Sequence, residues 1–340
     1  MATALPKLLR ATRALQLIMM AVITVIRAEG TVLDRVLDAR HRTSCLGLRR
    51  KPYGTFHAAQ IKTGWGRCQR PVAIVEDNEI VASAEQYDLA GMIDGRAVPV
   101  CGIGSVLIEP SHRDQGRVLI QTLVDDGARR GAEIALLFSL QGMDDDVRND
   151  FQAIPLTDVT LGVTQSLRHG APMTMVRGGE ERDFAAIVAM GRVRAEHVRL
   201  HLDRDIDFVQ YVITRKRLLA GLGPANARQL HFFIAEEGIT AAAYLVLSVV
   251  GDTWTLEECG DRDPSGARVG ALLQALIARE PVERRPTIKA WLPPGFLPPQ
   301  VTIVAAAPST TAIGVRILRS TPTTPPYSAD DILYWRNDVF

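Results

Sequence analysis

The sequence predicts an α/β protein with two tandem copies of one fold, each a mixed twisted sheet flanked by helices, and with a degenerate second copy. Three observations lead to this prediction. The chain has 340 residues, of which 47% are hydrophobic, and this suits two domains that each bury a core. Signals for a β-hairpin, a loop, a helix and a buried strand follow one another between residues 71 and 138. The same order returns between residues 233 and 292 with few matching residues, which indicates a duplication.

The first twenty residues are considered separately from the two copies of the fold. Three basic residues precede an apolar run at 14–26, as in a signal peptide. The run is shorter than the roughly 20 apolar residues that cross a bilayer, and no small-x-small cleavage site follows it. The β-branched stretch 22–27 predicts a first strand instead. We therefore expect residues 1–20 to be a leader or an extension, with a targeting role left open.

The first copy is expected to span residues 21–165. Apolar residues at helical spacing predict a helix after Thr31, whereas the pattern of 43–70 fits either a helical region or a loop over a cleft. The three strands that follow are expected at 72–75, 80–89 and 98–108.

The third of these strands is unusual because Gly102 and Gly104 interrupt it. Glycines inside a strand often mark a bulge or a close approach of another backbone. After the loop Pro110–Gly116, amphipathic spacing predicts a helix that ends at Gly131. The apolar run Ile134–Phe138 then predicts a buried strand parallel to the third one.

The second copy is expected to span residues 170–320. Two amphipathic helices are predicted within 178–221. Strands are then expected at 233–238, 240–250, 253–259 and 287–292, with a helix after the loop 260–266. The last segment, 321–340, is expected to dock on the folded body, because its apolar residues around Tyr334 and Trp335 would otherwise face water.

Composition excludes several classes of function. The net charge is +1 and the basic residues form no long run, so we expect no nucleic-acid partner. The four cysteines include no CxxC pair and are interpreted as reduced thiols of a cytoplasmic protein. The seven histidines include no HExxH pattern, so no metal site is expected. No membrane partner is expected either, and the oligomeric state stays open.

The loop before the predicted helix of the first copy is the candidate binding site. A chain that enters a helix exposes amide N–H groups at the positive end of the helix dipole, and these groups attract an anion. Gly116 would let a pyrophosphate approach the backbone, and Arg113 and Arg117 would balance its charge. An ordinary turn between a strand and a helix is the alternative.

The stretch Val106-Leu-Ile-Glu-Pro-Ser-His-Arg-Asp-Gln-Gly-Arg-Val118 resembles the acetyl-CoA signature of the GCN5-related N-acetyltransferase (GNAT) superfamily. That signature ends a bulged strand and continues as Arg/Gln-x-x-Gly-x-Gly/Ala. Arg113 and Gly116 match it, whereas Val118 is larger than the family's Gly or Ala. The resemblance is good over 71–163 and loose over 21–70. It implies that acetyl-CoA is a co-substrate and that it is bound by Val106, Leu107, Ile108, Arg113, Asp114, Gln115, Gly116, Arg117 and Val118.

The two-copy plan resembles the enhanced-intracellular-survival acetyltransferases, in which the second GNAT-like domain is degenerate. In the second copy of this chain the loop 260–266 lacks the Arg-x-x-Gly spacing and carries Pro264. We therefore expect acetyl-CoA to bind the first copy only.

The resemblance also implies catalytic positions. In the family, a backbone amide of the bulged strand stabilises the oxyanion and a tyrosine after the next strand protonates the leaving thiolate. This chain has Asp146 at the tyrosine position, and an exposed Asp with a pKa near 4 is a weak acid toward a thiolate. A solvated helix start is the alternative for this acidic segment.

Two further carboxylates are candidates for the base. Glu85, on the second strand, is one, with a surface carboxylate as the alternative. In the enhanced-intracellular-survival family the chain ends in Phe and its terminal carboxylate enters the catalytic cleft. By that resemblance the carboxylate of Phe340 is a candidate base or proton relay, with a strand that completes the second domain as the alternative.

Together these features indicate an acyl-CoA-dependent N-acyltransferase that moves an acetyl group to an amine on a small molecule or a protein. The alternative is a non-catalytic CoA-binding or interaction protein on the same scaffold.

Overall fold

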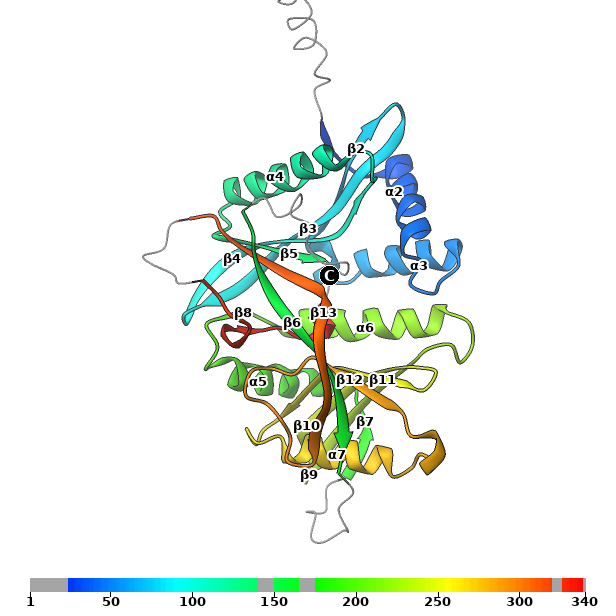
Figure 1. The fold of residues 1–340 in the computed structure, drawn as a ribbon, viewed down its shortest axis with the longest axis vertical. Helices are drawn as coiled ribbons and strands as arrows, with labels where there is room; N and C mark the ends of the chain where they lie inside the picture. Colours follow the sequence, from blue (N-terminus) through cyan, green and yellow to red (C-terminus); the bar gives the residue numbers. More distant parts are fainter. Residues whose placement is uncertain (1–23, 140–149, 165–174, 320–325, 339–340) are drawn as a thin grey trace, which may run out of the picture.

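The computed structural model describes residues 24–139, 150–164, 175–319 and 326–338 (Figure 1). The segment 1–20 and the candidate residues Asp146 and Phe340 lie outside this part of the chain. Among the described residues, no helix is both long enough and apolar enough to cross a bilayer.

The first half begins with a short strand and two helices, so that the stretch 43–70 is mostly helical. Its elements are β1 (Val25–Arg27), α2 (Gly30–Thr43), α3 (Arg50–Ile61), a 3₁₀ turn (Trp65–Cys68), β2 (Gln69–Glu76), β3 (Glu79–Ile93), β4 (Arg96–Ile108), α4 (Arg113–Arg129), β5 (Ile134–Ser139) and β6 (Gln152–Val163).

The second half repeats this order of elements. It consists of β7 (Met175–Gly178), α5 (Phe184–Ala195), β8 (Leu200–Leu202), α6 (Ile206–Leu222), β9 (Gln229–Glu237), β10 (Thr240–Val250), β11 (Thr253–Asp261), α7 (Ala267–Ile277), β12 (Thr287–Ala290) and β13 (Val301–Ile317). The short strand β14 (Ile332–Leu333) follows and pairs with β8. Apart from β8, each element of the second half has a counterpart at the same place in the first, so the structure contains a duplication.

The two halves share one fourteen-stranded sheet over the described residues. Its strand order is β1-β2-β3-β4-β5-β13-β6-β12-β11-β10-β9-β7; off this path, β8 pairs with β3 and β14 pairs with β8. β13, the last strand of the second half, therefore lies between β5 and β6 of the first half, and β6 lies next to β12 of the second. β13 pairs with β5 over Ala312–Ile317 and with β6 along almost its whole length. With 17 residues at about 3.3 Å each, β13 is about 55 Å long and can cross both halves.

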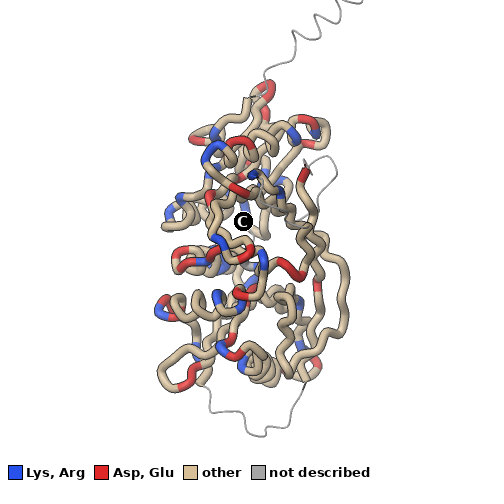
Figure 2. Tube along the Cα trace, turned by 90° about the vertical axis from the view of Figure 1, so that its left-hand side faces the viewer, with Lys and Arg blue, Asp and Glu red and all other residues tan. Residues whose placement is uncertain are grey.

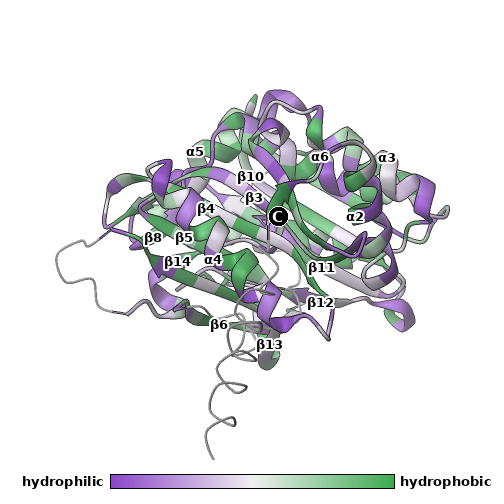
Figure 3. Cartoon of the chain, turned by 90° about the horizontal axis from the view of Figure 1, so that it is seen from above, coloured by the Kyte–Doolittle hydropathy of each residue, from purple (hydrophilic) through white to green (hydrophobic). Residues whose placement is uncertain are grey.

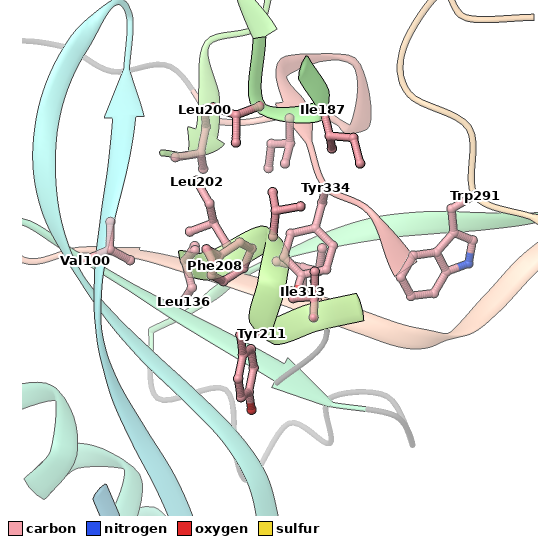
Figure 4. Packing of buried hydrophobic residues seen from close by; sticks show 14 of the residues in the cluster. Val100, Leu136, Ile187, Leu200, Leu202, Phe208, Tyr211, Trp291, Ile313 and Tyr334 are labelled. Atoms are coloured by element: carbon pink, nitrogen blue, oxygen red, sulfur yellow. The ribbon is translucent and has the colours of Figure 1, made fainter. Parts of the chain in front are cut away.

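The main hydrophobic core lies between the halves (Figure 4). It combines Tyr87 and Leu136 from the first half with Phe208 and Tyr211 from α6 and with Tyr334 from the C-terminal segment. Helix α6 runs across the middle of the molecule and packs against α3 (Figure 1). Seen from above, hydrophobic residues are concentrated on the sheet and on the helix sides that face it (Figure 3). The halves thus stabilise one another through a shared core.

Charged residues of both signs are interspersed over the described chain (Figure 2). This agrees with the near-neutral composition. No group of three or more His, Cys, Asp or Glu side chains within the described ranges is arranged to hold a metal ion.

Candidate functional site

Strand β4 contains a bulge close to the predicted position. Its pairing with β3 runs in register from Ile93 and Arg96 to Glu85 and Gly104, then shifts before it resumes at Ser83 and Leu107. Ser105 has a φ of 49°, a left-handed conformation that is uncommon for a residue with a side chain. A bulge leaves the extra residue outside the ladder. The backbone after Gly104 can therefore present an N–H group to a ligand.

Strands β4 and β5 diverge just before this bulge. Their parallel pairing extends from Val100 and Ile134 to Ile103 and Leu137 and goes no further. Both strands continue beyond that point, β4 to Ile108 and β5 to Ser139. The opening between them begins beside the bulge, so an extended ligand that entered between the strands would meet the irregular backbone of β4.

Helix α4 begins directly after β4 with an uncapped end. His112 occupies the N-cap position but makes no capping hydrogen bond with its side chain, and the helical ladder starts where the Gly116 N–H donates to the His112 carbonyl at 3.2 Å. Arg113, Asp114 and Arg117 are exposed around this first turn, and Gln115 is half-buried. The first turn of α4 thus combines the positive end of the helix dipole with two exposed arginines, an arrangement that favours an anion.

Gly116 has a packing role that the sequence did not reveal. A Cβ atom at this position would lie 2.4 Å from Cδ1 of Ile108. Glycine therefore lets α4 approach β4 closely. From the sequence, we expect this glycine to make room for a pyrophosphate. In the structure, the side of Gly116 on which a Cβ atom would lie faces the Ile108 side chain.

The other predicted cofactor-binding residues lie on both faces of β4. Val106 and Ile108 pack in the core cluster beneath α4, whereas Leu107 packs against the cluster under α2. Val118 lies one turn into α4 and is 36% exposed. The structure thus brings all nine residues together around the end of β4 and the start of α4.

The corresponding helix of the second half has its N-terminus occupied by the protein itself. The Asp261 carboxylate accepts hydrogen bonds from the backbone N–H groups of Arg268 at 2.8 Å and Val269 at 3.4 Å. The Arg268 guanidinium also pairs with Asp261 at 3.1 Å. A Cβ atom on Gly266 would lie 2.5 Å from the ring of Phe296. A carboxylate and an aromatic ring therefore fill the place that would hold an anion in this half.

Glu85 lies at the centre of a buried polar cluster on the other face of β3. The neighbouring residue Gln86 faces α4, where it donates to the Leu123 carbonyl at 2.8 Å, and successive side chains of a strand point to opposite faces. The Glu85 carboxylate is bonded by Arg40 of α2 and by Gln69 of β2, and the Tyr87 hydroxyl donates to it at 2.6 Å.

These contacts fix the charge of Glu85. Burial alone would raise its pKa, but Arg40 and the hydrogen bonds from Tyr87 and Gln69 outweigh burial and lower the pKa to about 2. Glu85 is therefore ionised at neutral pH and binds protons weakly. These surroundings therefore disfavour the expected role of Glu85 as the base that accepts the proton of the amine.

The C-terminal segment reaches the same region from the second half. Ile332, Leu333, Tyr334 and Trp335 are buried. The Tyr334 ring stacks on Phe138, near the end of β5, and its hydroxyl donates to the Asp338 carbonyl at 2.8 Å. The chain therefore passes close to the point where β4 and β5 diverge.

The sequence did not reveal the partners of Glu85, which are Arg40, Gln69, Tyr87 and also His57, whose Nδ1 lies 3.8 Å from the carboxylate. Arg40 stands four residues after Val36 on the buried face of α2, so a charged residue in an apolar helical stripe was the available signal. His57 lies in the stretch 43–70, where the sequence pattern was undecided, and gave no signal of its own.

Several solved acyltransferases have this fold. A GCN5-related N-acetyltransferase from Kribbella flavida is 18% identical, with a TM-score of 0.62 over 87% of this chain and 71% of that one. Eis1 from Mycobacterium abscessus is 13% identical, with a TM-score of 0.51 over 87% and 74%. N-myristoyltransferase from Saccharomyces cerevisiae, solved with bound myristoyl-CoA, is 10% identical, with a TM-score of 0.54 over 89% and 85%.

No protein-family model and no curated protein matches the sequence. At such low identities the structural likeness establishes the fold. The chain has the GNAT fold, and the tandem two-copy arrangement expected from the sequence is confirmed.

Proposed function

We propose that this protein is an acyl-CoA-dependent N-acyltransferase that binds its acyl-CoA through the first half of the chain. The observation that carries the proposal is the combination at the end of β4: a bulge at Ser105, the divergence of β4 from β5 after Ile103, and the uncapped start of α4. These three features would place a thioester carbonyl beside a backbone N–H while the start of α4 holds the pyrophosphate.

Acyl transfer to an amine requires a donor amide for the oxyanion, a group that takes the proton of the amine, and a path for the leaving thiolate. The bulge supplies the first of these. Acetyl-CoA is the proposed donor, on the basis of the loop 113–118, and the acceptor is an amine on a small molecule or a protein. Asp146 and the Phe340 carboxylate stay proposals for proton transfer, by the family resemblance.

Binding of CoA tests the site, and calorimetry of the full-length protein is the direct measurement. Arg117→Gln should weaken CoA binding by about tenfold or more, because a hydrogen bond to a charged group contributes about 1.5–3 kcal/mol. Arg129→Gln is a matched control on the last turn of the same helix, where Arg129 is exposed and pairs with Asp126. Equal CoA affinity in the two variants would contradict the proposed site.

Release of free thiol from acetyl-CoA in the presence of a panel of amines tests the reaction. Amine-dependent release is expected. CoA binding without release toward any amine would favour the alternative of a non-catalytic CoA-binding protein.

A further inference from the structure

We propose that His57 of α3 is the proton acceptor of the acyl transfer, and that Glu85 stabilises the imidazolium that forms. This inference rests on the proposed function. It assigns a role to a residue that no sequence motif indicated.

The position of the Glu85 cluster relates it to the reaction. Glu85 on β3 pairs with Gly104 on the neighbouring strand β4, and Gly104 directly precedes the bulged Ser105. Its side chain points to the face of the sheet away from α4, where α2 and α3 pack. An acyl group that passed between β4 and β5 beside the bulge would face the side of the sheet on which the Glu85 cluster lies.

The cluster lacks hydrogen-bond partners at three atoms. Within the described residues, Nη2 of Arg40, Nε2 of His57 and Oε1 of Gln69 are buried and unpartnered. Each belongs to a side chain that already contacts Glu85, so the three atoms surround one carboxylate. Buried polar atoms without partners are costly, and such groups in a functional region indicate a place for a bound polar molecule.

His57 is oriented by the cluster. Its Nδ1 lies 3.8 Å from Oε1 of Glu85, and the residue is 6% exposed. A hydrogen on Nδ1 would face the carboxylate, which leaves the lone pair of Nε2 to accept a proton. This tautomer leaves the basic lone pair on Nε2, the ring atom that has no hydrogen-bond partner among the described residues.

The charges around His57 suit a base at neutral pH. Burial lowers the pKa of His57 below its usual value and outweighs the opposing effect of Glu85, while Arg40 lowers it further. On α6, the Arg215 side chain donates to Gln60, one turn along α3 from His57. The imidazole is therefore neutral before the reaction, whereas Glu85 is already ionised and paired with Arg40.

The step itself is balanced. The amine nitrogen forms a bond to the thioester carbonyl carbon, the C–S bond breaks, and CoA leaves as a thiolate. The proton lost by the amine passes to Nε2 of His57, directly or through one water. Glu85, next to Nδ1, then stabilises the positive charge of the imidazolium.

Nitrogen-15 NMR of the full-length protein tests the tautomer without any variant. At pH 7.5 the His57 ring should carry its hydrogen on Nδ1 and an unprotonated Nε2. A hydrogen on Nε2 instead would remove the lone pair and overturn the proposal.

Kinetics tests the role. His57→Gln should lower kcat/KM for acetyl transfer by about 10²-fold or more, the usual range for a general base. In the parent protein kcat/KM should fall as the pH drops through the His57 pKa, because the imidazole is then protonated. His57→Gln should abolish this acid limb of the pH profile and leave the CoA affinity unchanged. The matched control is His41→Gln on α2, because the His41 ring contacts the Leu48 carbonyl at 2.9 Å rather than Glu85.

A His57→Gln protein that transfers acetyl at the parent rate, with the same acid limb, would refute the role of His57. A parent protein that binds CoA but transfers to no amine would instead refute the acyltransferase function, and the role of His57 with it.

Discussion

Tyr334 stacks on Phe138 with the ring centroids 5.6 Å apart and the ring planes 17° from parallel. Phe138 lies on β5, one residue beyond the last pair that joins β5 to β4, and Tyr334 belongs to the C-terminal segment. This contact places the end of the chain next to the opening between β4 and β5. It also ties the second half to the candidate acyl-CoA site of the first, because β14 is held by β8.

The docked C-terminal segment should be sensitive to pH. Asp338 is buried, and burial raises its pKa to about 6 despite the opposing charge of Arg204, with Glu258 raising it further. A carboxyl whose pKa is higher in the folded state stabilises folding at low pH, and this contribution is lost as the pH rises through about 6. Arg204 is already bonded by both Glu258 oxygens at 2.8 and 2.7 Å, so a second buried carboxylate leaves an excess negative charge.

Asp338→Asn should therefore raise the melting temperature at pH 7.5 and change it little at pH 5. The amide oxygen can still accept the hydrogen bond that the Trp335 N–H donates to Asp338 at 3.0 Å. Thermal unfolding of the parent and the variant at both pH values checks this. The difference in melting temperature between variant and parent at one pH cancels the titration of the groups that the two proteins share. A variant that is destabilised at pH 7.5 but not at pH 5 would show that the Asp338 charge stabilises the docked segment.

Gly116 should be required for the close packing of α4 on Ile108 of β4. Gly116→Ala would force the Cβ atom against Cδ1 and displace α4 from β4. Overpacking of this kind costs about 1–3 kcal/mol, and CoA affinity should fall with it. Adding Ile108→Val removes that Cδ1 atom and should recover part of both losses, measured by thermal unfolding and calorimetry. If Gly116→Ala weakens CoA binding without any loss of stability, the glycine serves the ligand and not the packing.

The fold class, the order of elements in each half and two local features near the candidate site could be predicted from the sequence. The loop Arg113–Val118 and the irregularity near Gly104 depend on local signals, namely glycine inside a strand and charge at a helix start. Both features were placed within one or two residues.

The exchange of β6 and β13 between the halves could not be predicted in this way. The local sequence of β13 is that of an ordinary apolar strand interrupted at Pro308. Its partner β6 lies more than a hundred residues earlier in the chain, so no local pattern indicates the pairing. The Glu85 cluster depends likewise on α2, α3 and β2 meeting in space. Contacts of that range leave no periodicity in the sequence.

Asp261 should stabilise the second half without affecting the cofactor. Asp261→Ala would leave the Arg268 and Val269 amides and the Arg268 guanidinium without this acceptor. Removing one partner of a buried charged pair costs about 3–5 kcal/mol, so thermal unfolding should show a large loss. Calorimetry should still show the parent affinity for CoA, because the binding loop lies in the first half. A loss of CoA binding in a folded Asp261→Ala protein would place a ligand in the second half.

Asp146→Tyr should raise turnover. By the family resemblance this position faces the departing thiolate, and a tyrosine has a pKa near 10, closer to that of a thiol than the pKa of an aspartate. Thiol release at saturating acetyl-CoA is the measurement, with Asp144→Tyr as a neighbouring control. An unchanged rate in a folded, CoA-binding Asp146→Tyr protein would count against the alignment of this segment with the family.

Extension of the chain end tests whether the terminal carboxylate takes part in the reaction. Three residues appended after Phe340 would displace the carboxylate but leave Tyr334 able to stack on Phe138 and Trp335 able to pack. Because His57 is the proposed proton acceptor, we expect acetyl transfer, the melting temperature and the CoA affinity all to hold. A collapse of transfer alone would assign the proton to the Phe340 carboxylate and count against His57. Tyr334→Ala is the structural control: it removes a buried aromatic ring, which costs about 3–5 kcal/mol, and should lower the melting temperature. Full acetyl transfer in the extended protein would exclude the Phe340 carboxylate and leave His57 as the proton acceptor.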